Sequence, residues 1–344
     1  MAESFIARLR RGHLLSRGWG RAVRELRSIV TTATLSATRP RDRYASIVTL
    51  NADEENATVQ AVFLGDSGDF DRIVLVTPSP EISRIAVGMA ARRLELEVPT
   101  ELEYRKLSYR ALLSEYRRSR ETYSTHVLLP GRDFSQRRRH VHLTHGSGPK
   151  PDTTFRAPTN VLASITPQWV EQQLKEYKLP PDTEVIEYMP RLEIMRRSVG
   201  DTSILEKLGL DPTKPLVVWA PTYRVTRRGR EMRVSGTPHG SASSCRSDDV
   251  EEQLKTACRK IRGTLIAKVH PHDLDSFSRF AFPVHSNESL YKAGVTPYEL
   301  FGAASLLITD YSSVYVERDF LRMPFMRIQY DSSAFARSYR SFRR

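Results

Sequence analysis

Polar residues that could do chemistry gather at four places in the sequence, each just after a predicted strand. These places are residues 145–147 (HGS), 221–224 (PTYR), 268–271 (KVHP) and 309–313 (TDYSS). Histidine can act as a base near neutral pH, and cationic side chains, hydroxyls and helix-start amides can hold phosphate. Ligands of open α/β sheets bind beyond the carboxyl ends of the strands. The pattern therefore predicts a site for a phosphate-bearing substrate.

His145 is the candidate general base. It enters a turn through Gly146 and Ser147, whose small size lets a substrate approach the imidazole. A histidine with an ordinary pKa can take the proton of a hydroxyl nucleophile. The alternative interpretation is a histidine buried in a tight turn.

Lys268 and His270 are candidates for charge balance. Two residues apart, they share one face of a predicted strand end and could neutralise a diphosphate as a nucleotide departs. Taken alone, His270 is better explained as a residue that caps the turn before Pro271.

The segment that contains Thr309, Asp310, Ser312 and Ser313 is predicted to lead from a strand into a helix. Hydroxyls and unpaired backbone amides at a helix start favour an anion. An ordinary N-cap uses the same residue types, so this signal is weak by itself.

The elements that must position these residues alternate between strands and helices, which predicts an α/β fold of two doubly wound, Rossmann-like halves. We expect a basic arm over residues 1–43, a first domain over 44–198 and a second over 199–344. Predicted strands cover residues 46–50, 59–64, 73–76, 126–129, 141–144, 216–219, 265–269 and 306–309, and predicted helices cover 81–93, 167–177, 249–261, 298–304 and a segment from 313.

Length and composition fit this organisation. The chain has 344 residues, of which 40% are hydrophobic and 27% charged, so it is long enough for two globular domains. No apolar stretch approaches the roughly 18 residues that a membrane span requires, and no secretion signal is predicted. Cys245 and Cys258 lack metal-site spacing and are interpreted as ordinary thiols. We expect no metal and no cofactor.

The net charge of +13 predicts contact with a polyanion. Residues 1–43 hold ten arginines and only three acidic residues, interleaved with apolar residues near helical spacing. This arm is either a helix on anionic lipid or a helix packed on the protein's own core. Two further basic clusters, at residues 132–139 and 224–233, are interpreted as loops.

Taken together, these segments resemble the CDP-glycerol glycerophosphotransferase family, which builds teichoic acids and related phosphate-linked polymers of the bacterial cell surface, capsule included. The resemblance covers about residues 144–330. It rests on the order and spacing of residues 145–147 (HGS), 203–210 (SILEKLGL), 220–224 (APTYR), 268–271 (KVHP), 308–314 (ITDYSSV) and 323–324 (MP).

The resemblance implies a GT-B-like fold with a donor site in the second domain and an acceptor site in the first. A CDP-glycerol or CDP-ribitol donor would give its polyol phosphate to a lipid-linked or polymer acceptor and release CMP, at the cytoplasmic face of the plasma membrane. No nucleic acid partner is expected. The implied residues are His145 and His270 for catalysis; Arg224, Lys268, Thr309, Asp310, Ser312, Ser313 and Glu317 for the donor; and Gly146, Ser147 and Arg191 for the acceptor side.

The sequence departs from the family's pattern at several of these positions. Ser147 stands where the family usually has a threonine, Tyr223 where it has a tryptophan and Glu317 where it has an aspartate. Of the family's usual Gly-Tyr-Pro-Arg-Asn-Asp run, which falls at residues 187–193, the arginine is kept as Arg191 and the Asn and Asp are not. Three rival interpretations remain open. They are a GT-B glycosyltransferase that uses a nucleotide sugar, a non-enzymatic nucleic-acid-binding protein, and a catalytically silent scaffold on a membrane.

Overall fold

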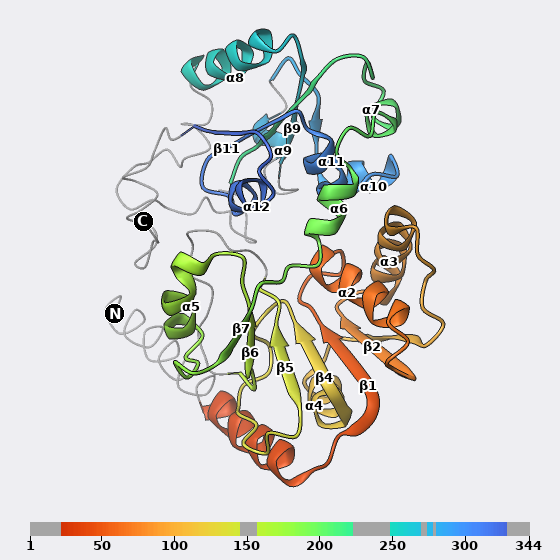
Figure 1. The fold of residues 1–344 in the computed structure, drawn as a ribbon, viewed down its shortest axis with the longest axis vertical. Helices are drawn as coiled ribbons and strands as arrows, with labels where there is room; N and C mark the ends of the chain where they lie inside the picture. The colour runs from red at the N-terminus through yellow and green to blue at the C-terminus, as the bar shows by residue number, and fades with distance from the viewer. Residues whose placement is uncertain (1–21, 145–156, 223–247, 270–273, 278–279, 329–344) are drawn as a thin grey trace, which may run out of the picture.

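The computed structural model describes residues 22–144, 157–222, 248–269, 274–277 and 280–328. They form two parallel β-sheets with helices around them, one in each half of the chain (Figure 1). This confirms the predicted α/β class. The boundary at residues 198 and 199 stays a prediction.

Within the described residues, the first sheet has seven strands and the second has five, and every pairing between them is parallel. In spatial order the first sheet is β3 (Leu102–Lys106), β2 (Arg72–Thr77), β1 (Arg41–Val48), β4 (Ser119–Ser124), β5 (Arg139–His142), β6 (Val161–Ala163) and β7 (Glu184–Ile186). The second is β10 (Val284–His285), β9 (Thr264–Lys268), β8 (Leu216–Ala220), β11 (Leu306–Thr309) and β12 (Phe325–Arg327).

The strand order reverses between β1 and β4 in the first sheet and between β8 and β11 in the second. Such switch points are where open α/β sheets bind ligands. The helices between the strands are α2 (Glu55–Asp66), α3 (Pro80–Leu94), α4 (Tyr109–Arg118), a 3-10 turn η1 (Pro167–Trp169), α5 (Val170–Glu176), α6 (Leu192–Arg197), α7 (Ser203–Lys207), α8 (Asp248–Lys260), α9 (Leu274–Phe277), α10 (Asn287–Lys292), α11 (Pro297–Ala303) and α12 (Val314–Phe320).

The central strands β1 and β2 of the first sheet are buried on both faces, because successive side chains of a strand point to opposite sides and helices cover both sides. In β1, Ala45 and Ile47 pack in the core beneath α2 and α3. Tyr44 and Val48 lie in a separate cluster with Leu112 of α4. Hydrophobic residues therefore occupy consecutive positions in these strands, which explains why β1 and β2 are recognisable in the sequence.

The core of the second sheet is centred on Trp219, which is only 1% exposed. Its ring contacts Phe277 and Phe280, at centroid distances of 5.3 and 5.4 Å. The two halves also pack against each other through helices. Helix α11 of the second half contacts α6, which precedes the predicted boundary, and α6 contacts α3 of the first half (Figure 1).

Two predicted strands are wrong. Residues 59–64 lie in helix α2, which is buried along nearly its whole length and so shows no amphipathic period to distinguish it from a buried strand. Residues 126–129 follow β4 instead of forming a strand. Strands β3, β4, β6, β7, β10 and β12 were not predicted, and all of them except β4 are two to five residues long, which leaves little periodicity to recognise. Helix α4, ten residues long, was also missed.

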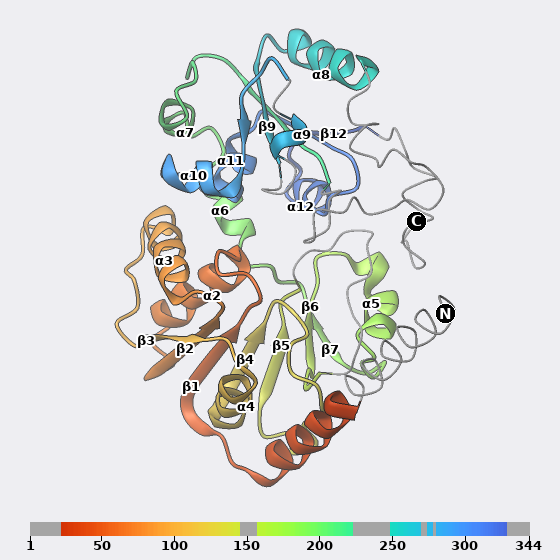
Figure 2. The ribbon, with the colours of Figure 1, turned by 180° about the vertical axis from the view of Figure 1, so that it is seen from behind.

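A helix over residues 22–37 precedes β1 and lies at the end of the first half that is remote from the second (Figures 1 and 2). Thr31 and Leu35 are fully buried, whereas Leu26 and Ile29 are 61% and 66% exposed. The described part of the basic arm thus packs on the core at one end only. The described part of the chain contains no helix with the length and hydrophobicity of a transmembrane span.

Candidate active site at the junction of the two halves

The switch point of the second sheet is closed by a buried hydrogen-bond cluster. Asp310, which follows β11, accepts hydrogen bonds through Oδ1 from the backbone N–H of Thr222 (2.8 Å) and from its hydroxyl (2.5 Å). The hydroxyl of Thr309, the last residue of β11, donates to the carbonyl oxygen of Ala220 in β8. Thr309 and Asp310 are 0% and 1% exposed. Thr309 and Asp310, both predicted to bind the activated donor substrate, therefore hold the carboxyl ends of β8 and β11 together.

Ser312 and Ser313 lie just beyond this cluster, at the start of α12. Both are partly exposed, and Ser313 makes no side-chain cap hydrogen bond. The ordinary N-cap interpretation therefore does not describe Ser313. The hydroxyls of the predicted phosphate segment remain at a switch point, where a ligand of this sheet is expected.

Arg191 joins the two halves through a buried ion-pair cluster. Its guanidinium donates to Glu54 Oε1 (3.2 Å) from the first half and to Glu317 Oε1 (2.6 Å) of α12. It also lies 4.5 Å from the ring centroid of Tyr298. Arg191 is 3% exposed and Glu317 is 0% exposed. Through Arg191, helix α12 is therefore held next to the segment that follows β1.

Asn56 connects this cluster to the predicted catalytic turn. Its Oδ1 accepts from the backbone N–H of Arg191 (3.2 Å), and its Nδ2 donates to the carbonyl oxygen of Thr144 (3.1 Å). Thr144 is fully buried with φ of 58°, which is unusual for a β-branched residue. Such strain is typical of functional segments that the surrounding structure holds in place. Thr144 immediately precedes His145.

Lys268, at the carboxyl end of β9, faces two acidic residues of the first half. Burial lowers the pKa of its ammonium group, whereas the charges of Glu55 and Asp53 oppose that shift. Asp53 also accepts a hydrogen bond from Asn287 of α10 (2.9 Å). The residues after β1 and those after β9 and β10 therefore lie together.

Glu55 is an ionisable group that the sequence analysis missed. It is 7% exposed, and burial raises its pKa to about 8, with a hydrogen bond from Thr296 and the charge of Arg191 in opposition. The backbone N–H of Tyr298 donates to its Oε1 (3.3 Å). A carboxyl group with such a pKa can hold or release a proton near neutral pH.

The predicted residues His145, Gly146, Ser147, Arg224 and His270 lie outside the described residues, as does the basic cluster at 224–233. Their described neighbours Thr144, Thr222 and Val269 each follow the carboxyl end of a strand. Among the described candidates, Arg191 and Glu317 come together directly.

The missed residues form one acidic run, Asp53, Glu54 and Glu55, followed by Asn56. The sequence did carry a signal for these residues, because polar residues just after a predicted strand are site candidates and this run comes soon after the predicted strand at 46–50. Its position at a switch point depended on the order of the strands, which the sequence does not reveal.

A comparison with protein families matches residues 182–343 to the family described as CDP-Glycerol:Poly(glycerophosphate) glycerophosphotransferase. The matched segment contains Arg191, Lys268 and the residues of the β8–β11 switch point. The predicted family resemblance is confirmed. Residues 182–343 are therefore similar in sequence to this family.

Solved structures extend the similarity of fold to the whole chain. The wall teichoic acid polymerase TagF is 15% identical, with a TM-score of 0.58 over 99% of this chain and 83% of that one. A UDP-N-acetylglucosamine 2-epimerase from Rickettsia bellii is 10% identical, with a TM-score of 0.50 over 85% of this chain and 81% of that one. The fold is therefore GT-B-like, as predicted. No curated protein sequence matches the chain.

Proposed function

We propose that the protein transfers glycerol phosphate, or a related polyol phosphate, from a CDP-activated donor to a hydroxyl group of a lipid-linked or polymer acceptor. The acceptor oxygen attacks the phosphorus that carries the polyol, the bond from that phosphorus to the bridging oxygen breaks, and CMP leaves. The observation that carries this proposal is the family match over residues 182–343, which includes the switch point where Ser312 and Ser313 lie.

On the donor side, Ser312 and Ser313 hold the diphosphate, and Lys268, His270 and Arg224 balance the charge that develops on the departing CMP. Glu317 contributes indirectly, because its ion pair with Arg191 orients α12. Phosphoryl transfer of this kind depends mainly on positioning and on fixed cationic groups. The buried contacts at this switch point supply such rigidity.

On the acceptor side, His145 takes the proton of the attacking hydroxyl, and Gly146 and Ser147 give that hydroxyl access. The hydrogen bond from Asn56 to the Thr144 carbonyl supports this role, because it fixes the residue before His145. Glu55 lies beside the same junction and can exchange a proton in the working pH range. It is a candidate positioning residue for Lys268.

We place the reaction in the synthesis of a bacterial teichoic acid or capsule polymer. The acceptor would be reached at the cytoplasmic face of the plasma membrane, with the protein bound peripherally to anionic lipid. The TagF likeness in fold and the basic composition of residues 1–43 support this assignment.

The test is CMP release from CDP-glycerol and CDP-ribitol with a lipid-linked or polymer acceptor, for wild type beside His145→Ala and His270→Ala. Loss of acceptor-dependent release in both variants, with unchanged thermal unfolding, is the expected result. Release that survives in His145→Ala would remove the proposed base. Consumption of a nucleotide sugar, with neither CDP donor used, would favour the glycosyltransferase.

A further inference from the structure

Four arginines line a pocket at the end of the first half that lies opposite the candidate active site. Its lining is Thr38, Arg39, Arg41, Arg117 and Arg118, and its volume is about 280 Å³. The first three precede or begin β1, and the last two end α4. Since β1 is eight residues long, roughly 25 Å of strand separates this pocket from the acidic run after β1.

The pocket has a large excess of positive charge. Among the described residues, Arg39, Arg41 and Arg117 form no ion pair, and Arg118 Nη1 lies 4.0 Å from Glu115 Oε1. Glu115 is closer to Arg105, at 2.6 Å. Arginines at a helix end can complement the helix dipole, which explains Arg117 and Arg118 separately. The dipole of α4 does not explain why a second chain segment adds two more arginines, Arg39 and Arg41, to the lining of the same pocket.

A buried arginine holds the two walls of the pocket together. Arg138 is 3% exposed, and its Nη2 donates to the carbonyl oxygens of Thr38 and Arg117, both at 2.9 Å, and to the Thr38 hydroxyl at 2.8 Å. Its Nη1 donates to the Leu35 carbonyl oxygen at 2.8 Å. Arg138 therefore links the two walls at the base of the pocket, and its own charge is balanced by Asp133, whose Oδ2 lies 3.2 Å from Arg138 Nη1.

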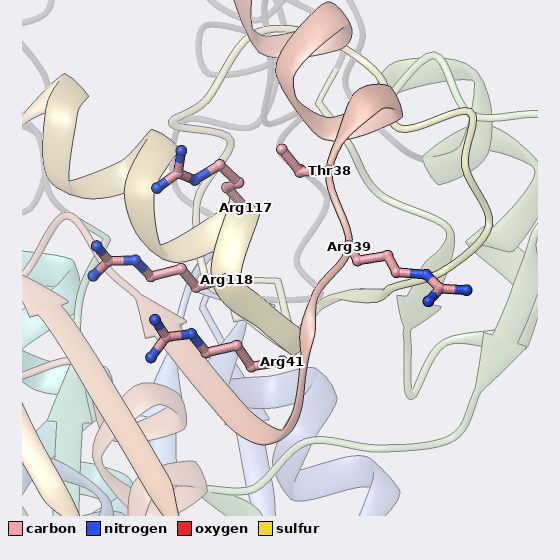
Figure 3. Close-up of a pocket in the computed structure, with 5 residues that line it drawn as sticks. All are labelled: Thr38, Arg39, Arg41, Arg117 and Arg118. Carbon is pink, nitrogen blue, oxygen red and sulfur yellow. The ribbon is translucent and has the colours of Figure 1, made fainter.

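The guanidinium groups do not converge on a single point. Figure 3 shows Arg41, Arg117 and Arg118 pointing to one side of the segment that leads into β1, and Arg39 pointing to the other. Arg120 at the start of β4 and Arg137 just before β5 are exposed, and Arg120 Nη1 donates to the Arg137 carbonyl oxygen at 3.4 Å. Positive charge thus continues from β1 across β4 to β5.

We propose that this surface, Arg39, Arg41, Arg117, Arg118, Arg120 and Arg137, binds the phosphodiester backbone of an extended polyanion, which is the phosphate-linked polymer that the enzyme elongates. Guanidinium groups bind phosphate oxygens through charge-assisted hydrogen bonds. The anion site itself stands on the geometry, and the identity of the polymer rests on the proposed function. Held here, a polymer remains near the enzyme between successive transfers.

An extended chain fits this surface better than a lipid membrane does. Every side chain that lines the pocket is an arginine or Thr38, so no apolar residue is available there to enter a bilayer. The exposed apolar residues Val23, Leu26, Ile29 and Val30 lie toward the other end of the helix over 22–37. Aromatic side chains for stacking on bases are also absent from the pocket lining, which disfavours single-stranded nucleic acid.

The experiment measures the binding of a short labelled glycerol phosphate oligomer to the full chain, with Arg39→Gln/Arg117→Gln beside wild type. Both residues are exposed, so the fold should survive the change. Arg92→Gln/Arg110→Gln is the matched control, because it removes the same charge from two exposed arginines of the same half. We expect the affinity to fall about tenfold or more in the pocket variant and less than about twofold in the control.

Equal affinity in the two double variants would overturn the proposal. So would tighter binding of a DNA or RNA oligomer than of the glycerol phosphate oligomer, or a dependence on Arg39 and Arg117 seen only with anionic vesicles. CMP release with a monomeric acceptor should be unchanged in the pocket variant. A failed transferase assay with intact oligomer binding would therefore reject the proposed function and leave the anion site standing.

Discussion

At the scale of single residues, the molecule depends on buried charges that are each matched by several partners. Arg191 is the clearest example, because it meets Glu54 and Glu317 from different halves of the chain. Buried pairs of this kind contribute little relative to a well-packed apolar replacement, but the loss of one member leaves an uncompensated charge.

Arg191→Met should therefore lower the free energy of unfolding by about 3–5 kcal/mol, because Glu54 and Glu317 then remain buried without a counter-charge. Arg196→Met is the control, because Arg196 is exposed and its pair with Glu193 is solvated; its loss should cost less than about 1 kcal/mol. Urea unfolding at neutral pH measures both. An equal cost in the two variants would contradict the role of Arg191.

Glu55 predicts a pH dependence of stability. Its folded pKa is raised to about 8 from an ordinary 4.5, so the folded state keeps a proton that the unfolded state has lost. The contribution of Glu55 to the free energy of unfolding is largest below the pKa of the unfolded state. It decreases as pH rises from that pKa toward the folded-state pKa, by at most about 1.4 kcal/mol per pH unit.

Glu55→Gln does not titrate, so its stability relative to wild type should increase as pH rises through that window. Denaturant unfolding of both proteins at a series of pH values gives this difference directly. A difference that stays constant with pH would mean that Glu55 ionises as easily in the folded state as in the unfolded one.

The two serines before α12 give a kinetic prediction. If Ser312 and Ser313 hold the diphosphate, Ser312→Ala and Ser313→Ala should each lower kcat/KM for the donor about tenfold or more, as expected for a lost hydrogen bond to a charged group. Ser305→Ala is the control, because Ser305 is exposed at the opposite end of β11. Steady-state kinetics with varied donor would show an unchanged kcat/KM in all three variants if the assignment is wrong.

At the scale of elements, the junction depends on the close approach of α6 and α11. A Cβ atom at Gly302 in α11 would lie 2.2 Å from the carbonyl oxygen of Met195 in α6. Gly88, in the middle of α3, has no atom within 4 Å of the corresponding position. The two helical glycines therefore differ only in their surroundings.

Gly302→Ala should destabilise the protein by about 1–3 kcal/mol, because α11 must move away from α6. Gly88→Ala should stabilise it by roughly 0.5–1 kcal/mol, because alanine is the better helix former. Thermal unfolding of the two variants compares them. A stabilising Gly302→Ala would show that the two helices are not in tight contact.

The sequence predicted some of the secondary-structure elements correctly and missed others. Of the strands that position the candidate site, β8, β9 and β11 are short, mainly apolar runs followed by polar residues, whereas β5 has the sequence RHVH. The structure places all four within a few residues of the predictions. Helix α2 was mistaken for a strand because burial on all sides removes the amphipathic period. Arg138, predicted in a solvated loop, is buried because its partners Leu35, Thr38 and Arg117 are remote in sequence.

At the scale of the whole molecule, the two halves meet through the carboxyl ends of their sheets. Arg93 of α3 bonds both to Asp201 (2.5 Å) and to Glu299 of α11 (2.7 Å). Together with Arg191, it provides a polar connection between segments that lie more than 100 positions apart. No local pattern predicts such contacts, which is why the acidic run at residues 53–55 was not recognised as part of the candidate site.

If the enzyme transfers a polyol phosphate, the donor bond that breaks is the one from the polyol-bearing phosphorus to the bridging oxygen, and CMP is released. ³¹P NMR of the products formed by wild type from CDP-glycerol and acceptor shows this bond change directly. We expect one new phosphodiester for each CMP released. CDP-glycerol left intact, or CMP released together with free glycerol phosphate and no new phosphodiester, would refute the proposed transfer.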